Sequence, residues 1–494
     1  MADENSLINE RKKKLEELLG LGINPYPHNF EVTHKSAELR ERYRTVEKGE
    51  STRRNESVAG RIRAIRDMGK VTFMDVEDSK GRMQLCLFES KLGRENYSLL
   101  KKVDIGDIFG ADGEIIRTRS GELSINVDKY MILSKSIRPL PDERAGFKDP
   151  ELRYRQRSVD LIMNPKVKEV LIKRTKIIEG VRDFLNRDGY LEVETPLLQP
   201  IYGGANARPF ITELNALKIP MYLSISPELY LKRLIVGGIE RVYTISKNFR
   251  NEGIDATHNP EFTMMECYAT YQDYEDMMSL TENMYSSICE AVNGTTRVEY
   301  QGKMLEFKPP WKKVTMYDSV LENLGIEVEK MSLDDIKEEV MRRGYNSKIN
   351  AGEYTNKGEL VQKLFEEYSE KNLVSPTFVI DHPKETTPLC KTHRKNPDLI
   401  ERFEPFVCGM EIGNAYSELN NPIIQRRLLE EQDRAKSLGN EEAHPFDEPF
   451  LEAIEYGMPP TGGLGLGIDR MVMLLTNQKS IRDVIYFPFM RPLV

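Results

Sequence analysis

The sequence of 494 residues is poor in cysteine and lacks long hydrophobic runs. Its five cysteines are scattered without a CxxC pair, which is typical of reduced thiols in an intracellular protein and argues against a structural zinc site. No apolar run approaches the length of a membrane span. The first nineteen residues, MADENSLINERKKKLEELL, are charged where a secretory leader would be apolar. We therefore expect a cytoplasmic protein with no membrane partner.

An overall excess of positive charge is also absent. The chain has 71 Lys and Arg against 79 Asp and Glu, a net charge of −8, which argues against a protein that coats nucleic acid without specificity. Residues 1–66 differ, with 14 basic against 11 acidic side chains, a local balance of +3. This mild excess permits a polyanionic partner for the N-terminal region but does not require one.

The pattern along the chain predicts more than one domain, since 494 residues exceed what a single core usually holds. Residues 1–57 are predicted to form a helical extension, whose basic stretch 11–14 fits either a solvated helix face or a nucleic-acid arm. Short alternating runs in 58–137 predict five strands and a small β-barrel, with the OB-fold as the leading candidate. A proline-bearing linker is expected at 138–150. Residues 151–494 mix helices and strands, with a helix at 166–188 and a charged helical insertion at about 313–372.

The stretch GLGLGIDR at residues 463–470 combines three glycines with an acid and an arginine. A P-loop would end in Gly-Lys-Ser/Thr, and a dinucleotide fingerprint would place its glycines between a strand and a helix of a βαβ unit. Neither pattern fits, because these glycines lead into Ile468 and a further apolar run. Other parts of the chain must explain them.

Residues 240–271 predict an antiparallel hairpin with Arg250 and Glu252 at the end of its first strand. Glu266 and Tyr268 lie on one face of the second strand, because side chains two apart point the same way. A guanidinium facing a carboxylate and an aromatic ring suits a site that binds phosphate and a flat base. A surface ion pair in a hairpin turn is the alternative.

Several separated motifs resemble those of the class II aminoacyl-tRNA synthetases. They are Arg250-Asn-Glu252 with the following HNPEF, the terminal GLGLGIDR, and the stretch RTKIIEGVRDFLNRDGYLEVETPLL, which is similar to the dimer-forming first motif of that class. GGANARPF, PELYLKR, DHPKETTPLCK and EIGNAYSELN narrow the resemblance to lysyl-tRNA synthetases of subclass IIb. The resemblance implies an α+β protein in which an OB-fold barrel precedes a catalytic domain built on an antiparallel sheet flanked by helices.

The resemblance also implies an activity and its cofactor. Such enzymes activate L-lysine with ATP to lysyl-adenylate and pyrophosphate, then transfer lysine to the 3′ end of tRNA(Lys), with Mg²⁺ (two or more ions per subunit) bound beside ATP. Most members work as homodimers. By resemblance, Arg250 and Arg470 are catalytic, and Glu404 and Glu411 bind metal. The residues implied to bind ATP are Arg250, Glu252, His258, Asn259, Phe262, Glu411 and Arg470.

Lysine recognition is implied for a second set of residues, which includes Glu228 near the α-amino group and Glu266 and Glu418 near the side-chain ammonium. The full set is Gly204, Glu228, Arg250, Glu266, Tyr268, Asn414, Tyr416 and Glu418. On the barrel, Phe73 is implied to stack on the uridine-rich anticodon, and the polar readers implied there are Arg66, Gln84 and Glu122. An exposed Phe on a barrel face is otherwise often a packing residue.

Three other functions remain open at this point. A relative that charges aspartate or asparagine would share the barrel and core, but an acid-rich pocket opposes an acidic substrate. A catalytically silent, RNA-binding paralogue that uses the barrel alone is opposed by the presence together of Arg250, Glu404, Glu411 and Arg470. A protein-lysylating relative would lack the barrel.

Lys330-Met331-Ser332 is similar to part of the KMSKS loop of class I synthetases, but Ser332 and Asp335 predict a helix capping box instead. Thr257 stands where bacterial members often carry Arg, which removes one possible phosphate contact.

Overall fold

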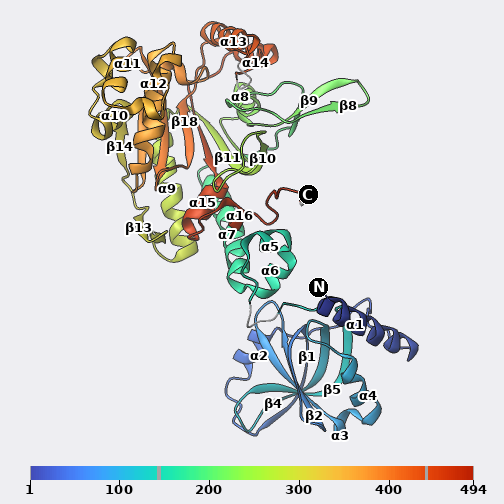
Figure 1. Ribbon diagram of the computed structural model, residues 1–494. Coiled ribbons are helices and arrows are strands. Elements are labelled where there is room, and N and C mark those ends of the chain that lie inside the picture. The colour runs from blue at the N-terminus through green and yellow to red at the C-terminus, as the bar shows by residue number, and fades with distance from the viewer. Residues whose placement is uncertain (1, 142–145, 440–442, 493–494) are drawn as a thin grey trace. The chain divides into compact units, whose positions relative to one another are not determined.

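The computed structural model describes residues 2–141, 146–439 and 443–492, and part of the expected linker, 142–145, lies outside them. The chain divides into two compact units, residues 1–148 and 149–494. Figure 1 labels the elements of both units. Among the described residues, no helix has the length and hydropathy needed to cross a membrane. The five cysteines are free thiols.

The first unit contains a closed five-stranded barrel in the order β1-β2-β3-β5-β4. Its strands are β1 (Ser51–Asp67), β2 (Val71–Glu77), β3 (Arg82–Phe88), β4 (Ile108–Arg117) and β5 (Leu123–Ser134). Its helices are α1 (Ala2–Gly20), α2 (Ser36–Arg42), α3 (Glu89–Leu92), α4 (Arg94–Leu99) and the 3-10 turn η1 (Leu100–Lys102). The first strand thus starts at Ser51, earlier than the expected 58, because the polar segment 51–57 pairs with β4 although it carries no apolar alternation.

Helix α1 is tied to the barrel through its basic residues. Arg11 is 9% exposed and donates hydrogen bonds to the carbonyls of Ile105 (2.9 Å) and Ser136 (3.1 Å). Lys14 Nζ lies 2.7 Å from Asp104 Oδ1. Arg11 is therefore a buried contact rather than part of a solvated helix face, and the partly exposed Lys14 is paired with a carboxylate of the barrel.

The second unit is built on a large sheet in the order β14-β15-β16-β18-β19-β11-β10-β6, with β17 paired to β16. Its strands are β6 (Leu191–Glu192), β10 (Arg241–Phe249), β11 (Glu261–Thr270), β14 (Lys312–Thr315), β15 (Thr377–Pro383), β16 (Leu399–Val407), β17 (Met410–Glu411), β18 (Gly413–Ser417) and β19 (Thr461–Gly467). Two small sheets join β7 (Leu198–Gln199), β8 (Ile211–Leu214) and β9 (Ile219–Leu223), and β12 (Arg297–Tyr300) and β13 (Lys303–Glu306). The pairing is antiparallel except at β14–β15 and β10–β6.

Helices flank this sheet. They are α5 (Pro150–Arg155), α6 (Arg157–Met163), α7 (Pro165–Arg187), α8 (Glu228–Val236), α9 (Tyr274–Asn293), α13 (Pro422–Ser437), α14 (Glu448–Glu455), α15 (Ile468–Leu475) and α16 (Ile481–Val484). Helix α7 matches the expected 166–188, and Gly189 follows it at φ 79°. The barrel, followed by an antiparallel-rich sheet with helices, confirms the expected α+β fold class.

The segment predicted as an insertion is largely helical and has its own hydrophobic cluster. It contains α10 (Met316–Leu324), α11 (Leu333–Arg342), α12 (Lys357–Leu364), the π-helical turn η5 (Phe365–Ser369), and the 3-10 turns η2 (Val328–Lys330), η3 (Tyr345–Ser347), η4 (Ala351–Glu353) and η6 (Glu370–Asn372), with η7 (Lys384–Thr386) following β15. Ser332 Oγ accepts from the Asp335 amide at 3.2 Å and forms the predicted capping box of α11.

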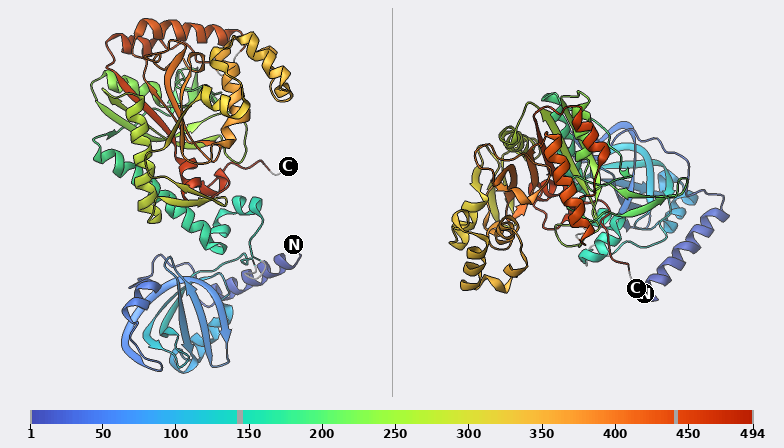
Figure 2. Two further views of the ribbon diagram at one scale, coloured as in Figure 1. Left: turned by 90° about the vertical axis from the view of Figure 1, so that its left-hand side faces the viewer. Right: turned by 90° about the horizontal axis from the view of Figure 1, so that it is seen from above.

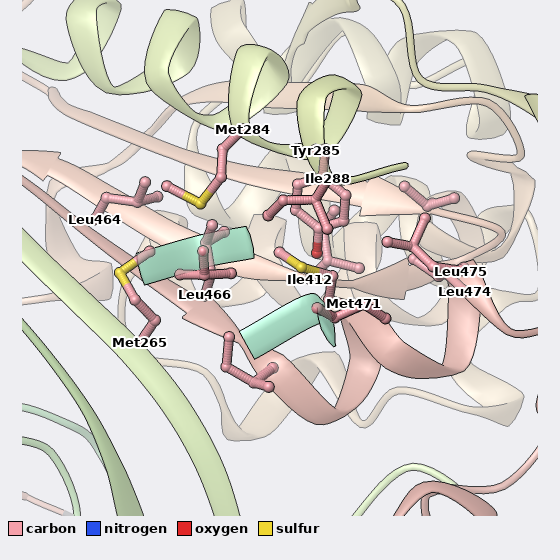
Figure 3. Packing of buried hydrophobic residues seen from close by; sticks show 14 of the residues in the cluster. Met265, Met284, Tyr285, Ile288, Ile412, Leu464, Leu466, Met471, Leu474 and Leu475 are labelled. Atoms are coloured by element: carbon pink, nitrogen blue, oxygen red, sulfur yellow. The ribbon is translucent and has the colours of Figure 1, made fainter. Parts of the chain in front are cut away.

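One face of the large sheet is covered by α9, which packs across β16, β18 and β19 (Figure 2). Figure 3 shows Met265, Leu464 and Leu466 from the strands meeting side chains of α9 and α15. Because strand side chains alternate, Met265 and Cys267 of β11 enter this core and Glu266 and Tyr268 point to the other face. That second face carries the cavity.

Candidate active site

A cavity of about 370 Å³ lies on the face of the large sheet opposite α9. Every residue predicted to bind ATP, lysine or metal lines it, from Gly204 to Arg470. Residues of β11, β16, β17, β18 and β19, of the start of α8 and of the loop after β10 converge there, although they are far apart in sequence. The structure therefore brings the whole predicted set together.

The glycines of GLGLGIDR form the floor of this cavity on β19. A Cβ built on Gly463 would overlap Oε1 of Glu418 and would lie 2.5 Å from Cε1 of Tyr268. A Cβ on Gly465 would lie 3.1 Å from Cε of Met264. Glycine is needed at 463 and 465 because side chains of neighbouring strands lie across β19 at these positions.

Asp469 of the same motif has a structural role. Its carboxylate accepts hydrogen bonds from Arg174 Nη1 of α7 (2.6 Å) and from the Thr263 amide of β11 (2.7 Å), and it is 2% exposed. Arg174 Nη2 also donates to Thr263 Oγ1 at 3.0 Å. A buried ion pair with these additional hydrogen bonds fixes the first turn of α15 against the helix and the strand.

Three buried carboxylates occupy one end of the cavity. Glu228, Glu266 and Glu418 are 4%, 4% and 1% exposed. Glu266 accepts from Ser226 Oγ at 2.9 Å and from the Tyr268 hydroxyl at 3.2 Å. This end of the site is therefore strongly acidic and closed to solvent.

The side chain of Lys232, which no sequence motif had suggested as a site residue, lies between two of these acids. Its Nζ is 2.6 Å from Glu228 Oε1 and forms an ion pair with Glu418 Oε2, and the side chain is fully buried. Oε1 of Glu418 has no hydrogen-bond partner among the described residues. The i, i+4 spacing of Glu228 and Lys232 in PELYLKR could have indicated their pairing, but not the link to Glu418.

Burial controls the protonation of this acidic end. It raises the pKa of Glu266 to about 8, and the nearby carboxylate of Glu228 adds to the rise. Burial also raises the pKa of Glu418 to about 8, against the attraction of Lys232. For Lys232 burial alone would lower the pKa, but Glu228 and Glu418 raise it above its ordinary value. An entering cation would therefore displace protons from the acids.

The opposite end of the cavity is basic. The guanidinium of Arg250 lies 5.1 Å from the centre of the Phe262 ring, and its buried Nε has no hydrogen-bond partner among the described residues. Burial lowers the pKa of Arg250. A partly buried arginine whose buried Nε donor is unused is poised to receive an anionic ligand.

Arg470 is held at the same end by neighbouring groups. Its Nη1 donates to the Glu411 carbonyl at 2.5 Å, and its Nη2 lies 3.2 Å from His258 Nε2. His258 Nδ1 in turn lies 2.8 Å from Asp255 Oδ2, a residue that the sequence did not single out. Glu252 is exposed at the rim. Asn259 has both polar side-chain atoms engaged by the backbone, donating to the Glu261 carbonyl (2.6 Å) and accepting from the Phe489 amide (3.2 Å).

Glu404 and Glu411 share the basic end. Glu404 Oε1 accepts from Arg402 Nη2 at 2.5 Å, and burial raises the pKa of Glu404 to about 7 in spite of that arginine. The described residues include no group of three or more His, Cys, Asp or Glu side chains arranged for a metal ion. Two carboxylates fit an ion that takes its remaining ligands from phosphate and water.

Arg402 also organises the polar wall of the cavity. Its Nε donates to Asn414 Oδ1 at 3.0 Å, and Asn414 Nδ2 donates to the Tyr416 hydroxyl at 2.5 Å. Gly204, at φ 86°, lies where a Cβ would be 2.9 Å from Cβ of Glu228. The backbone of Gly204 therefore lines the acidic end directly.

The barrel carries three of its four predicted readers on one outer face. Phe73 alternates with the buried Met74 and pairs with Arg66 on β1, and Gln84 on β3 pairs with Asp75, two residues from Phe73. Arg66 forms two hydrogen bonds of 2.9 Å with Asp75. Glu122 precedes β5 and accepts from Arg40 of α2 at 2.9 Å. Arg40 and Asp75 were not predicted.

The two units match known families at positions that agree with this geometry. Residues 149–491 match the family described as tRNA synthetases class II (D, K and N), and residues 56–133 match the OB-fold nucleic acid binding domain. With its nucleotide-sized cavity on an antiparallel sheet, the chain therefore belongs to the class II aminoacyl-tRNA synthetases.

Curated relatives narrow this class further. The lysine–tRNA ligase of Clostridium novyi is 49% identical over 99% of this chain and 96% of its own length. Those of Thermoanaerobacter sp. and Carboxydothermus hydrogenoformans are 48% and 47% identical, each over 99% of this chain and over 96% and 98% of their own lengths. Within its class, the chain is thus a member of the lysine–tRNA ligases.

Proposed function

We propose that the cavity activates L-lysine with ATP and then transfers the lysyl group to the 3′ end of tRNA(Lys), with the roles given below. The observation that carries this proposal is one cavity with three buried carboxylates at one end and two arginines at the other. Lysine presents two ammonium groups to the acids, and ATP presents its phosphates to the arginines. An enzyme that charges aspartate would not need three carboxylates in its amino-acid site, because its substrate is itself acidic.

The lysine carboxylate attacks the α-phosphorus of ATP, and pyrophosphate leaves. No protein nucleophile is required, so catalysis depends on alignment and charge neutralisation. The unused donor of Arg250 supports a role in holding the lysine carboxylate and the α-phosphate together. Asn414 supplies a second donor to the carboxylate. Arg470 and His258 bind the distal phosphates.

The adenine base and the magnesium ions bind the remaining residues of the basic end. Arg250 lies over one face of the Phe262 ring, and the adenine stacks on the other face with Glu252 accepting from its amino group. Asn259 positions the loop through the backbone contacts described above. Glu404 and Glu411 would hold Mg²⁺, two or more ions with ATP, which supplies positive charge to the phosphates. Without Arg at position 257, the grip on the triphosphate depends on His258 and Arg470.

The acidic end selects lysine. Glu228 and the backbone of Gly204 receive the α-amino group, and Glu266 and Glu418 receive the side-chain ammonium beside Tyr268 and Tyr416. Leaving these buried acids unpaired costs several kcal/mol, so a neutral amino acid of similar size is rejected.

Amino-acid-dependent exchange between ATP and pyrophosphate tests this function. We expect lysine to support exchange and aspartate and asparagine to give none above background. Because exchange needs no tRNA, it isolates the cavity of the second unit from the barrel. Exchange that depends on aspartate or asparagine, or on no amino acid, would contradict the proposal.

We propose that the outer face of the barrel with Phe73, Arg66 and Gln84 binds the anticodon, with Glu122 beside it. Phe73→Ala is expected to raise KM for tRNA about 5- to 100-fold, since stacking on an aromatic ring contributes about 1–3 kcal/mol per base. Pyrophosphate exchange should stay unchanged. Met131→Ala is the matched control, because Met131 is 42% exposed on β5 and was not predicted to read bases. Equal aminoacylation kinetics in Phe73→Ala and wild type would remove Phe73 from the interface.

We further propose a cytoplasmic homodimer. Exposed large apolar side chains on and beside β6, β7, β8 and β9 support it, because exposed apolar surface is typical of protein–protein contacts. They are Leu191, Leu197, Leu198, Ile211, Leu217 and Ile219.

A further inference from the structure

Lys232 raises a problem of charge, because a pocket proposed to receive an ammonium group already contains one. Its Nζ contacts one oxygen each of Glu228, in α8, and of Glu418, which directly follows β18. The side chain is fully buried, so solvent does not screen these contacts. Lys232 is thus a permanent part of the amino-acid site.

The location of this ammonium leaves specific atoms for a ligand. Oε1 of Glu418 is buried, has no hydrogen-bond partner among the described residues, and lies against the bare backbone of Gly463. Glu266 is bound only by hydroxyl groups, those of Ser226 and Tyr268, and by no cation of the described chain. A cationic ligand therefore finds acceptors that Lys232 does not satisfy.

The charged side chains at the acidic end of the cavity do not balance one another. When all three acids are ionised, as an entering cation favours, three carboxylates and one resident ammonium leave a surplus of two negative charges at this end. A free α-amino acid with a cationic side chain brings two ammonium groups, and its carboxylate is matched by Arg250. A buried site is most stable when its charges are paired, because each unpaired buried charge carries a large desolvation penalty.

We propose that Lys232 is a resident counter-ion that sets the charge of the amino-acid pocket, so that a ligand with two ammonium groups completes the balance. It acts through Glu228 and Glu418 and is a positioning and specificity-determining residue. The inference rests on the proposed function, since it takes lysine as the ligand. Neutral amino acids leave one carboxylate unpaired in this pocket, and acidic ones add a further negative charge.

Lys232→Met tests the proposal by removing the ammonium while keeping most of the side-chain volume. We expect KM for lysine in pyrophosphate exchange to rise about 100-fold or more. Without the ammonium of Lys232, one of the three buried carboxylates is left without a cationic partner when lysine is bound. KM for ATP should change less than about twofold, since the basic end is untouched.

The double variant Lys232→Met/Glu418→Gln separates charge balance from packing. It removes one cation and one acid, which restores the surplus of two negative charges. We expect its KM for lysine to be at least about 10-fold lower than in each of the two single variants, a coupling that independent structural losses would not produce. If Lys232→Met fails to fold, the comparison with Glu418→Gln alone still decides the question.

The barrel provides a matched control. Lys135 is also a fully buried lysine, and it contacts the carboxylates of Asp104 and Asp107. Lys135→Met should lower the thermal stability of its unit and leave KM for lysine within about twofold of wild type, because distant sites act independently.

Two results would overturn the counter-ion role. One is a wild-type KM for lysine in Lys232→Met, and the other is a double variant no better than the single ones. The proposed function would still stand in both cases if Glu266→Gln lost lysine activity. Retention of lysine activity by Glu266→Gln would instead contradict the proposed lysine pocket itself.

Discussion

Glu266→Gln is expected to lower kcat/KM for lysine about 1,000-fold, because a site built around a specific polar contact discriminates strongly when the contact is lost. The substitution keeps the shape of the side chain and an acceptor oxygen for one of the two hydroxyls of Ser226 and Tyr268, but it removes the charge that faces the ligand. Glu266 is 4% exposed, so no water replaces the missing interaction. KM for ATP should change less than about twofold.

Pyrophosphate exchange at varied lysine and varied ATP measures both parameters. Glu261→Gln is the matched control, since Glu261 lies on the same strand β11 but is exposed. Lysine kinetics in Glu266→Gln equal to those of the control would refute the assignment. A substitution of this kind at an exposed glutamate should be silent.

The same carboxyl also sets a pH dependence. Burial raises the pKa of Glu266 to about 8, and only its ionised form pairs with an ammonium group. Protonation is favoured in the empty site, so kcat/KM for lysine in the wild type should rise as the pH increases toward about 8. The rise should be smaller in Glu266→Gln, which has no proton to lose at this position.

Arg250→Ala is expected to reduce the rate of adenylate formation about 1,000-fold, the loss typical when one preorganised donor to a developing charge is removed. In contrast to Glu266→Gln, both lysine and ATP kinetics should suffer, because Arg250 is proposed to contact both. Single-turnover adenylate formation measures this rate without the contribution of product release. The control is Arg241→Ala, because Arg241 lies at the start of β10, the strand that Arg250 directly follows, and pairs with Asp188.

The thermal stability of Arg250→Ala should not fall along with its activity. The Nε of Arg250 is buried with an unused donor, and burial lowers the pKa of Arg250, so its charged form is costly in the empty enzyme. Arg250→Ala should therefore unfold at an equal or higher temperature than wild type, a stability–function trade-off. A strong loss of stability together with unchanged adenylate formation would show a structural role only.

Local patterns were enough to predict much of the fold. Short alternating runs predicted the barrel, and the two-residue spacing of Glu266 and Tyr268 put both on one face of β11, which is the cavity face. The periodicity of 166–188 predicted α7 nearly to its ends. The start of β1 was missed because 51–57 is polar and is held by pairing with β4, which leaves no hydrophobic signature.

The parts of the site that were missed depend on contacts between distant segments. Lys232 meets Glu418 only after β18 and α8 are packed together, and Arg402 reaches Asn414 across the sheet. The sequence also could not separate the site role of Arg470 from the structural role of its neighbour Asp469. The roles of Glu404 and Glu411 followed from family resemblance, because two glutamates seven apart are otherwise typical of surface charge.

The carboxylate of Asp469 gives the site a mechanical property. It joins α7 and β11 at the residue that immediately precedes Arg470, so the direction in which that arginine reaches into the cavity is inherited from the long helix. The base of the Arg470 side chain is therefore positioned by a chain of contacts that begins at Arg174 of α7 and passes through Asp469.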